Sequence, residues 1–326
     1  MKILCRLTCI IAVFAFQSAF ATAPDPKLVV GPDKCGECHK AEFKVWKNTH
    51  HYKTFKKMHR TKEAKEIKEK MGIRRIKAES DCLTCHYTSK PKGGKAKPIA
   101  GISCESCHTP AKKWLDVHND LGGKDVKPKD EKPEHRKARI AKMKELGMIT
   151  HNDIYALASN CFSCHTVPNE KLVNVGGHQA GSKFELVSWS QGEVRHNFIS
   201  SPDGKTNVED PQPRKRLLYV VGRSVDLEYG LRGMAIASTA GKYADKMAAR
   251  VKAAIGELEK INKAKAIPEV SKMIAAAKSA KLVPNNKDAL LKTAATISEE
   301  AKKFASSNDG KAIAAIDKLI TAKYKK

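Results

Sequence analysis

The pentapeptide Cys-x-x-Cys-His occurs four times in this chain of 326 residues, and no other feature constrains it as strongly. The copies span residues 35–39, 82–86, 104–108 and 161–165. This pattern is the attachment signature of c-type haem. Two residues between the cysteines put both sulfurs on one helical turn, where they match two vinyl groups on one side of a porphyrin. The following His then falls under the iron as its proximal ligand.

Zinc sites and redox dithiols also use paired cysteines, so a single copy would be a weak signal. Neither needs a His directly after each second Cys, and the four copies use every cysteine beyond residue 9. The sequence therefore predicts four covalently bound c-type haems. Their attachment residues are Cys35, Cys38, Cys82, Cys85, Cys104, Cys107, Cys161 and Cys164, and their proximal ligands are His39, His86, His108 and His165.

The N-terminus has the features of a secretory signal peptide. Lys2 and Arg6 precede the apolar run 10–20, and Ala19-Phe20-Ala21 offers a small-x-small cleavage site. We expect cleavage after Ala21, loss of the peptide over residues 1–21, and export to the periplasm. No later apolar run is long enough to cross a bilayer.

The charge of the chain is strongly positive. Its 61 basic and 35 acidic residues give a formal net charge of +26. Such a surface favours acidic redox partner proteins, a donor oxidoreductase and a terminal acceptor, and would allow association with an anionic membrane surface. Nucleic acid is not expected as a partner, because an export signal is present and the basic residues form no patch with interleaved aromatic residues. The formation of homo-oligomers stays an open alternative.

Composition divides the chain after the signal peptide. Residues 22–201 hold every remaining Cys and His, 202–216 form a polar linker with turn-forming prolines, and 217–326 contain neither Cys nor His. The last segment has apolar residues at helical spacing, so we expect a helical hairpin or bundle there. The Cys-rich segment has too few apolar side chains to form a core alone. The sequence thus predicts a mainly α protein whose short helices and loops wrap around four haems, with a C-terminal helical domain.

Eight further histidines are candidates for the distal axial position of each iron. They are His50, His51, His59, His118, His135, His151, His178 and His196. His50 and His51 are neighbours, so both cannot reach one iron. Met58, Met71, Met143 and Met148 could also serve, although packing roles are more typical of them.

Two stretches, together with the order of the motifs, carry a resemblance. Residues 35–51 read Cys-x-x-Cys-His-Lys-Ala and then Trp46-Lys-Asn-Thr-x-His51, and 101–108 continue through Trp114 to His118. Over about residues 34–198 the chain resembles the tetrahaem cytochrome c-554 family. The resemblance implies that His51 ligates the fourth haem, His118 the first and His196 the third. It also implies a high-spin, five-coordinate second haem at His86.

His178 has no counterpart in that resemblance, and three interpretations stay open. It could complete the second haem and make all four irons bis-histidine, it could stand beside an open iron as a proton donor, or it could have no role. We include His178 among the metal ligands. His59, His135 and His151 are reserve candidates.

The expected function is electron transport in a respiratory chain by a periplasmic carrier. No catalytic residue is assigned, and an electron-transfer protein is favoured over an enzyme. Two alternatives remain: an enzyme that converts a small nitrogen or sulfur compound at an open second haem, or a subunit of a polymeric cytochrome filament.

Overall fold

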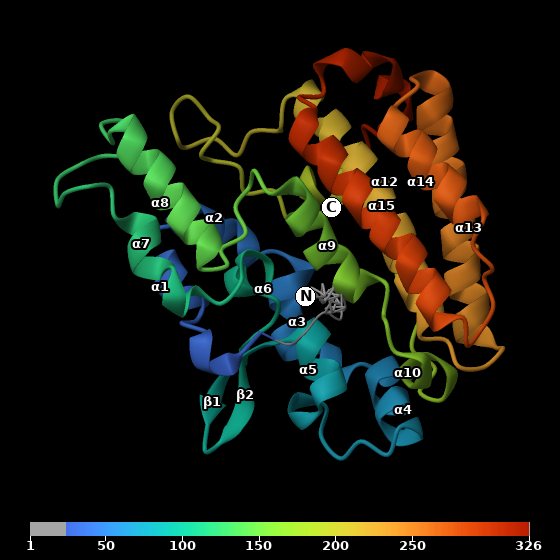
Figure 1. Ribbon diagram of the computed structural model, residues 1–326. Coiled ribbons are helices and arrows are strands. Elements are labelled where there is room, and N and C mark those ends of the chain that lie inside the picture. The colour runs from blue at the N-terminus through green and yellow to red at the C-terminus, as the bar shows by residue number, and fades with distance from the viewer. Residues whose placement is uncertain (1–23, 326) are drawn as a thin grey trace, which may run out of the picture.

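The computed structural model describes residues 24–325, so the expected signal peptide lies outside the described residues. The chain is mainly helical, with 60% helix and 4% strand. Figure 1 shows two regions: short helices and loops of the Cys-rich segment, and long helices of the C-terminal segment packed side by side. This agrees with the predicted mainly α class.

The Cys-rich region consists of short elements. In chain order they are η1 (Pro26–Leu28), α1 (Pro32–Gly36), α2 (Lys40–Trp46), α3 (His50–Lys57), η2 (Met58–Arg60), α4 (Lys62–Lys70), η3 (Ile76–Ala78), α5 (Ser80–His86), β1 (Thr88–Lys92), β2 (Lys95–Ala100), α6 (Cys104–His108), η4 (Ala111–Lys113), α7 (Leu115–Asn119), α8 (Pro133–Glu145), α9 (Ile154–His165), α10 (Glu170–Asn174) and α11 (Leu186–Ser190).

All four pentapeptides adopt a helical turn. Three of them lie at the C-terminal ends of α5, α6 and α9, and each of these helices ends at the His of its motif. The first motif begins in α1, and the His39 amide donates to the Cys35 carbonyl across a distance of 2.9 Å. The helical turn that places both sulfurs on one side is therefore present at each motif.

A β-hairpin was not anticipated from the sequence. Strands β1 and β2 pair antiparallel, with Lys92 opposite Lys95 across the turn. Gly93 and Gly94 both have positive φ, +58° and +73°, which is the geometry of a two-residue type I′ turn. The Gly-Gly pair between the two lysine-rich runs was the signal for this turn.

The C-terminal segment folds into α12 (Gln212–Ala235), α13 (Lys242–Ala264), α14 (Pro268–Lys278), α15 (Lys287–Ser307) and η5 (Lys311–Leu319). Helix α12 contacts α13 and α15, while α14 contacts both α13 and α15. The start of α12 lies inside the stretch 202–216 that was expected to be a linker, so that linker ends earlier than expected. Pro213 stands in the first turn of α12, where a missing N–H costs no hydrogen bond.

The apolar core is distributed unevenly. The larger cluster joins α12–α15 to α9, α10 and α11, and its fully buried members include Val220, Met247 and Phe304. The smaller cluster in the Cys-rich region has four buried residues, Ala64, Ile76, Leu83 and Tyr87. The N-terminal half therefore has little apolar core of its own, as its composition indicated.

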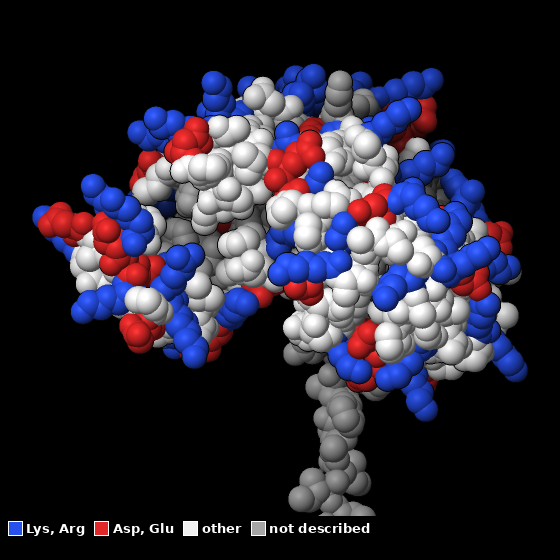
Figure 2. All heavy atoms as spheres, turned by 90° about the horizontal axis from the view of Figure 1, so that it is seen from above, with Lys and Arg blue, Asp and Glu red and all other residues white. Residues whose placement is uncertain are grey.

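On the face seen in Figure 2, basic side chains are more widespread than acidic side chains, which are interspersed among them over α8 and the C-terminal helices. Within the described part of the chain, no helix has both the length and the apolar character that a membrane span requires.

Candidate haem-binding sites

Each motif His faces a second His across a similar gap. The ring centroids lie 5.8 Å apart for His39 and His118, 6.4 Å for His86 and His178, 6.2 Å for His108 and His196, and 6.2 Å for His165 and His51. We call these pairs, with the cysteines of their motifs, sites 1, 2, 3 and 4 in the order of the motifs. The structure thus brings together every distal candidate that we assigned, including His178.

The second histidines come from separate elements. His51 lies in the first turn of α3 and His118 in the last turn of α7, whereas His178 and His196 lie in loops after α10 and α11. Because these elements are distant in sequence from their partners, the pairs depend on tertiary packing and not on local spacing alone.

Hydrogen bonds orient most of the paired rings through Nδ1. The bonds join His108 to the Ile149 carbonyl (2.8 Å), His196 to Val194 O (2.7 Å), His178 to Gln179 O (2.8 Å), His118 to Leu115 O (3.3 Å) and His165 to Ser182 Oγ (2.8 Å). When Nδ1 donates a proton, Nε2 carries a free lone pair, which is the form that ligates a metal.

Burial favours the neutral form of five of the paired imidazoles. It lowers the pKa of His86 and of His165 to about 4, and it also lowers the pKa values of His51, His108 and His118. A neutral imidazole is the ligating species, so these rings are in the right protonation state at neutral pH.

The residues at each site fit a c-type haem. Two metal–imidazole bonds of about 2 Å each, plus the distance from each ligating nitrogen to its ring centre, account for gaps of this size. A porphyrin supplies the other four nitrogen ligands, so two histidines complete the iron coordination. All eight cysteines of the described chain are free thiols, and each pair is therefore available for two thioether bonds.

Contacts between the motifs place the four sites in a row. Helix α1 contacts α6, and the nearby Cys104 side chain raises the pKa of Cys35, so sites 1 and 3 are neighbours. The nearby Cys164 side chain likewise raises the pKa of Cys85, so sites 2 and 4 are neighbours. Burial and then the nearby Cys107 raise the pKa of Cys161, so sites 3 and 4 are neighbours. The resulting order is 1, 3, 4, 2.

Glu105 organises the turn of site 3, and sequence analysis did not identify it. Its carboxylate is buried inside the third motif and accepts hydrogen bonds from the amides of Val30 (2.9 Å), Gly31 (2.7 Å) and Ala111 (2.7 Å). Three amide donors satisfy this buried charge. The only sequence signal for this role is the position of Glu105 between the two cysteines of the motif. That position does not show which distant amides bind its carboxylate.

Arg139 of α8 fixes the helix that carries His118. Its guanidinium donates to the His118 carbonyl (Nη1, 2.8 Å) and binds the Glu131 carboxylate through Nε (2.7 Å) and Nη2 (2.6 Å). The Glu131 side chain is only 1% exposed. A two-pronged pair of this kind constrains both orientation and distance, so α8 positions site 1 although it supplies no ligand.

The C-terminal helices contact site 4. Arg250 of α13 pairs with Asp226 of α12 at 2.5 Å and lies over the Phe162 ring of α9. Phe184 stacks on His165 with ring centroids 4.4 Å apart. The motif helix of site 4 is therefore held against the long C-terminal helices.

The remaining candidate ligands have other partners. His50 pairs with Glu193 at 2.7 Å and points away from the sites, as its position next to His51 suggested. His135 bonds Glu131 at 2.9 Å. Met58 packs in the smaller apolar cluster, and Met143 is buried. His59 and His151 have no paired imidazole among the described ring contacts.

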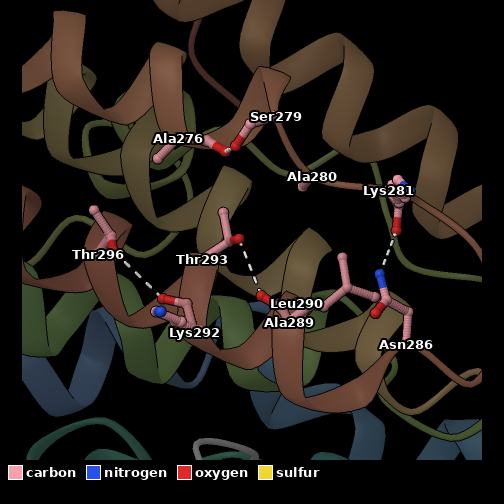
Figure 3. A pocket seen from close by; sticks show the side chains of 10 residues that line it. All are labelled: Ala276, Ser279, Ala280, Lys281, Asn286, Ala289, Leu290, Lys292, Thr293 and Thr296. Atoms are coloured by element: carbon pink, nitrogen blue, oxygen red, sulfur yellow. Dashed lines mark hydrogen bonds between the residues drawn. The ribbon is translucent and has the colours of Figure 1, made fainter.

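Two surface hollows lie apart from the paired histidines. One, of about 520 Å³, contains the unpaired His151. The other, of about 450 Å³, lies between α14 and α15. In Figure 3 its Thr293 and Thr296 hydroxyls already donate to carbonyls of their own helix.

Comparisons with known proteins relate part of the chain to cytochromes. Residues 34–109 match the family described as cytochrome c554 and c-prime. The chain is 34% identical over 120 residues to cytochrome c-554 of Nitrosomonas europaea, a match that covers 34% of this chain and half of the length of that relative. No solved structure matches the chain. The matched region 34–109 contains three of the four motifs, and the comparisons agree with the resemblance seen in the sequence: this chain is similar to c-type cytochromes of the c-554 family.

Proposed function

We propose that this protein is a periplasmic tetrahaem cytochrome that carries electrons between redox partners of a respiratory chain. The observation that carries the proposal is the set of four His–His gaps of 5.8–6.4 Å, each next to a Cys-x-x-Cys pair. When bound, haem c supplies a one-electron carrier that neither His nor Cys can provide.

The protein's own residues would attach, ligate and insulate the four groups. The paired cysteines would form the thioether bonds, and the paired histidines would supply the protein's ligands to the iron. The thiol contacts between neighbouring motifs support close spacing along the row 1, 3, 4, 2. Such a row suits transfer between partners better than storage at separate centres.

The His86–His178 pair favours a carrier over an enzyme. An enzyme that binds a small nitrogen or sulfur compound needs an iron with one open axial position. His178 faces His86 across the same gap that separates the other three pairs, so it is placed to occupy that position at site 2. The five-coordinate second haem that the family resemblance implied would then be absent from this protein.

The pairs also bear on the filament alternative. All eight paired histidines belong to one chain, so no site requires a ligand from a neighbouring subunit. The positive charge of the chain supports acidic donor and acceptor proteins as partners. Export depends on the N-terminal signal, which supports a periplasmic location.

A holoprotein preparation tests the proposal. Mass spectrometry of the exported protein should give a mass with four haems after cleavage near Ala21. The ferric protein should be entirely low-spin by optical and EPR spectroscopy, because each iron has two imidazoles. A mass with fewer than four haems would contradict the tetrahaem assignment, and one quarter high-spin haem would favour the enzyme.

A further inference from the structure

We propose that an acidic redox protein docks on residues 52–78, the segment that covers site 2. This inference rests on the proposed function and adds the surface and the site at which one partner binds. We call these residues the basic segment. They include most of α3, all of η2, α4 and η3, and the loops between them.

The basic segment carries a dense positive charge over a long stretch of the chain. Its 27 residues contain eleven Lys or Arg and three Glu. By comparison, the 115 residues 212–326 contain 24 basic and eleven acidic residues, so the net charge per residue is less than half as large there. The excess of positive charge is therefore larger in this segment than in the C-terminal helices.

Most of this charge is not neutralised within the fold. In the described chain, one ion pair falls in the basic segment, between Lys62 Nζ and Glu66 Oε1 at 3.8 Å, and the Lys62 side chain is 93% exposed. Burial and then the nearby Arg60 lower the pKa of Lys77, as expected where positive charges lie together. An acidic partner would relieve this repulsion.

Packing ties the basic segment to site 2. Phe55, Met58, Ala64 and Ile76 form one apolar cluster with Leu83, Tyr87 and the motif residue Cys82. On the distal side, Lys70 Nζ lies 3.4 Å from the position that a Cβ would occupy at Gly177, next to His178. Lys77 Nζ lies over the Phe55 ring at 3.9 Å. The positive charge thus flanks site 2 on both its proximal and its distal sides.

Site 2 is also one end of the row 1, 3, 4, 2, and the other end differs in charge. Residues 31–47, which carry the site 1 motif, contain four basic and three acidic residues. Figure 1 shows α4 at the opposite end of the molecule from α8, which braces site 1. The two ends therefore present different surfaces, and only the site 2 end is suited to electrostatic steering of an acidic protein.

Two triple variants with equal charge changes test the surface. One carries Lys65→Glu, Lys70→Glu and Arg74→Glu in the basic segment. The control carries Lys252→Glu, Lys263→Glu and Lys265→Glu on α13 and the loop after it. All six side chains are exposed, and no ion pair is recorded for them in the described chain. Both variants lose the same positive charge. Any difference in their binding of an acidic probe is therefore due to the position of the substituted residues.

Poly-L-glutamate serves as the acidic probe, titrated into the holoprotein at low ionic strength. We expect the basic-segment variant to bind at least fivefold more weakly than the control, and the difference to disappear in high salt. In stopped-flow experiments, oxidation of the reduced protein by the anion ferricyanide should also slow severalfold only in the basic-segment variant. Equal effects in both variants would overturn the proposal.

Anionic lipid vesicles provide the competing outcome. If vesicle binding depends on the basic segment while poly-L-glutamate binding does not, the surface recognises lipid and the proposal is wrong. Haem content, measured by mass on the same samples, separates this failure from failure of the proposed function. If the protein carries four haems but poly-L-glutamate does not bind at the basic segment, only the docking surface is refuted. If poly-L-glutamate binds there but the protein carries fewer than four haems, only the tetrahaem assignment is refuted.

Discussion

His178 faces His86 with the two ring centroids 6.4 Å apart, although 92 residues separate them in sequence. The Nδ1 atom of His178 lies 2.8 Å from the carbonyl oxygen of the next residue, Gln179, which turns the opposite edge of the ring toward His86. The site 2 pair has a ring separation similar to that of the other three pairs, so His178 is placed to be tested as a ligand of site 2.

We expect His178→Ala to convert one haem in four from low to high spin, because its iron would lose one strong-field imidazole. The variant should bind cyanide or nitric oxide much faster than the wild-type protein, since one axial position becomes open. EPR and stopped-flow absorbance measure the two effects.

His59→Ala is the matched control, because His59 has no imidazole opposite it in the described chain. Its spectrum should equal that of the wild type. A His178→Ala spectrum that also equals the wild type would show that His178 does not ligate, and would restore the five-coordinate second haem that the family resemblance implied.

The sequence was informative where chemistry or periodicity is local. The four pentapeptides predicted helical turns, which the structure has. Apolar residues at helical spacing, such as Met247 and Phe304, predicted the buried faces of α13 and α15, and Pro268 begins α14 as a first-turn proline. Signals of this kind depend on neighbours within two turns, so a single sequence contains them.

Other features could not be predicted because they depend on contacts between distant segments. Nothing near Glu105 indicates that Val30 and Gly31 will donate to its carboxylate from 74 or 75 residues away. The bracing of His118 by Arg139 likewise requires that α8 fold back on α7. Only the β-hairpin had an overlooked local signal, the Gly93-Gly94 turn.

The Glu131–Arg139 pair should make stability depend on acid pH. Hydrogen bonds from Arg139 lower the pKa of the Glu131 carboxyl from 4.5 to about 2. A lowered pKa in the folded state means that the stabilisation is complete above pH 4.5 and is lost as the pH falls toward 2. We expect Arg139→Gln to flatten this part of the stability curve, measured by urea unfolding between pH 2 and 6.

Arg136→Gln is the control for that series, because Arg136 is exposed on the same helix. Its curve should follow that of the wild type. Wild-type stability that did not change between pH 4.5 and 2 would contradict the assigned role of the pair.

Tyr155→Phe tests how α9 is held by the C-terminal helices. The Tyr155 hydroxyl donates to Glu228 Oε2 at 2.7 Å, and Glu228 is 1% exposed, so its pKa is raised by burial. Removing one donor from a buried carboxylate should lower the free energy of unfolding by about 1–3 kcal/mol. Tyr324→Phe removes a hydroxyl that donates to Glu209 Oε2 at the surface (3.0 Å), and it should lower the free energy of unfolding by no more than about 1 kcal/mol. Equal effects in chemical denaturation would show that the buried bond does not matter.

Gly101→Ala should disturb site 4 through the backbone of α3. A Cβ at Gly101 would overlap the His51 carbonyl oxygen and come within 2.6 Å of Thr54 Oγ1. Thr54 Oγ1 donates to that same carbonyl (2.7 Å) and lies 3.2 Å from the His86 carbonyl, so α3 cannot shift without affecting sites 4 and 2 together. Overpacking of this kind costs about 1–3 kcal/mol, and we expect partial loss of the low-spin EPR signal of site 4.

Gly256→Ala is the control, because nothing lies within 4 Å of its Cβ position and Ala is favoured over Gly inside a helix. If Gly101→Ala is as stable and as fully low-spin as Gly256→Ala, the close approach of β2 to α3 does not position His51.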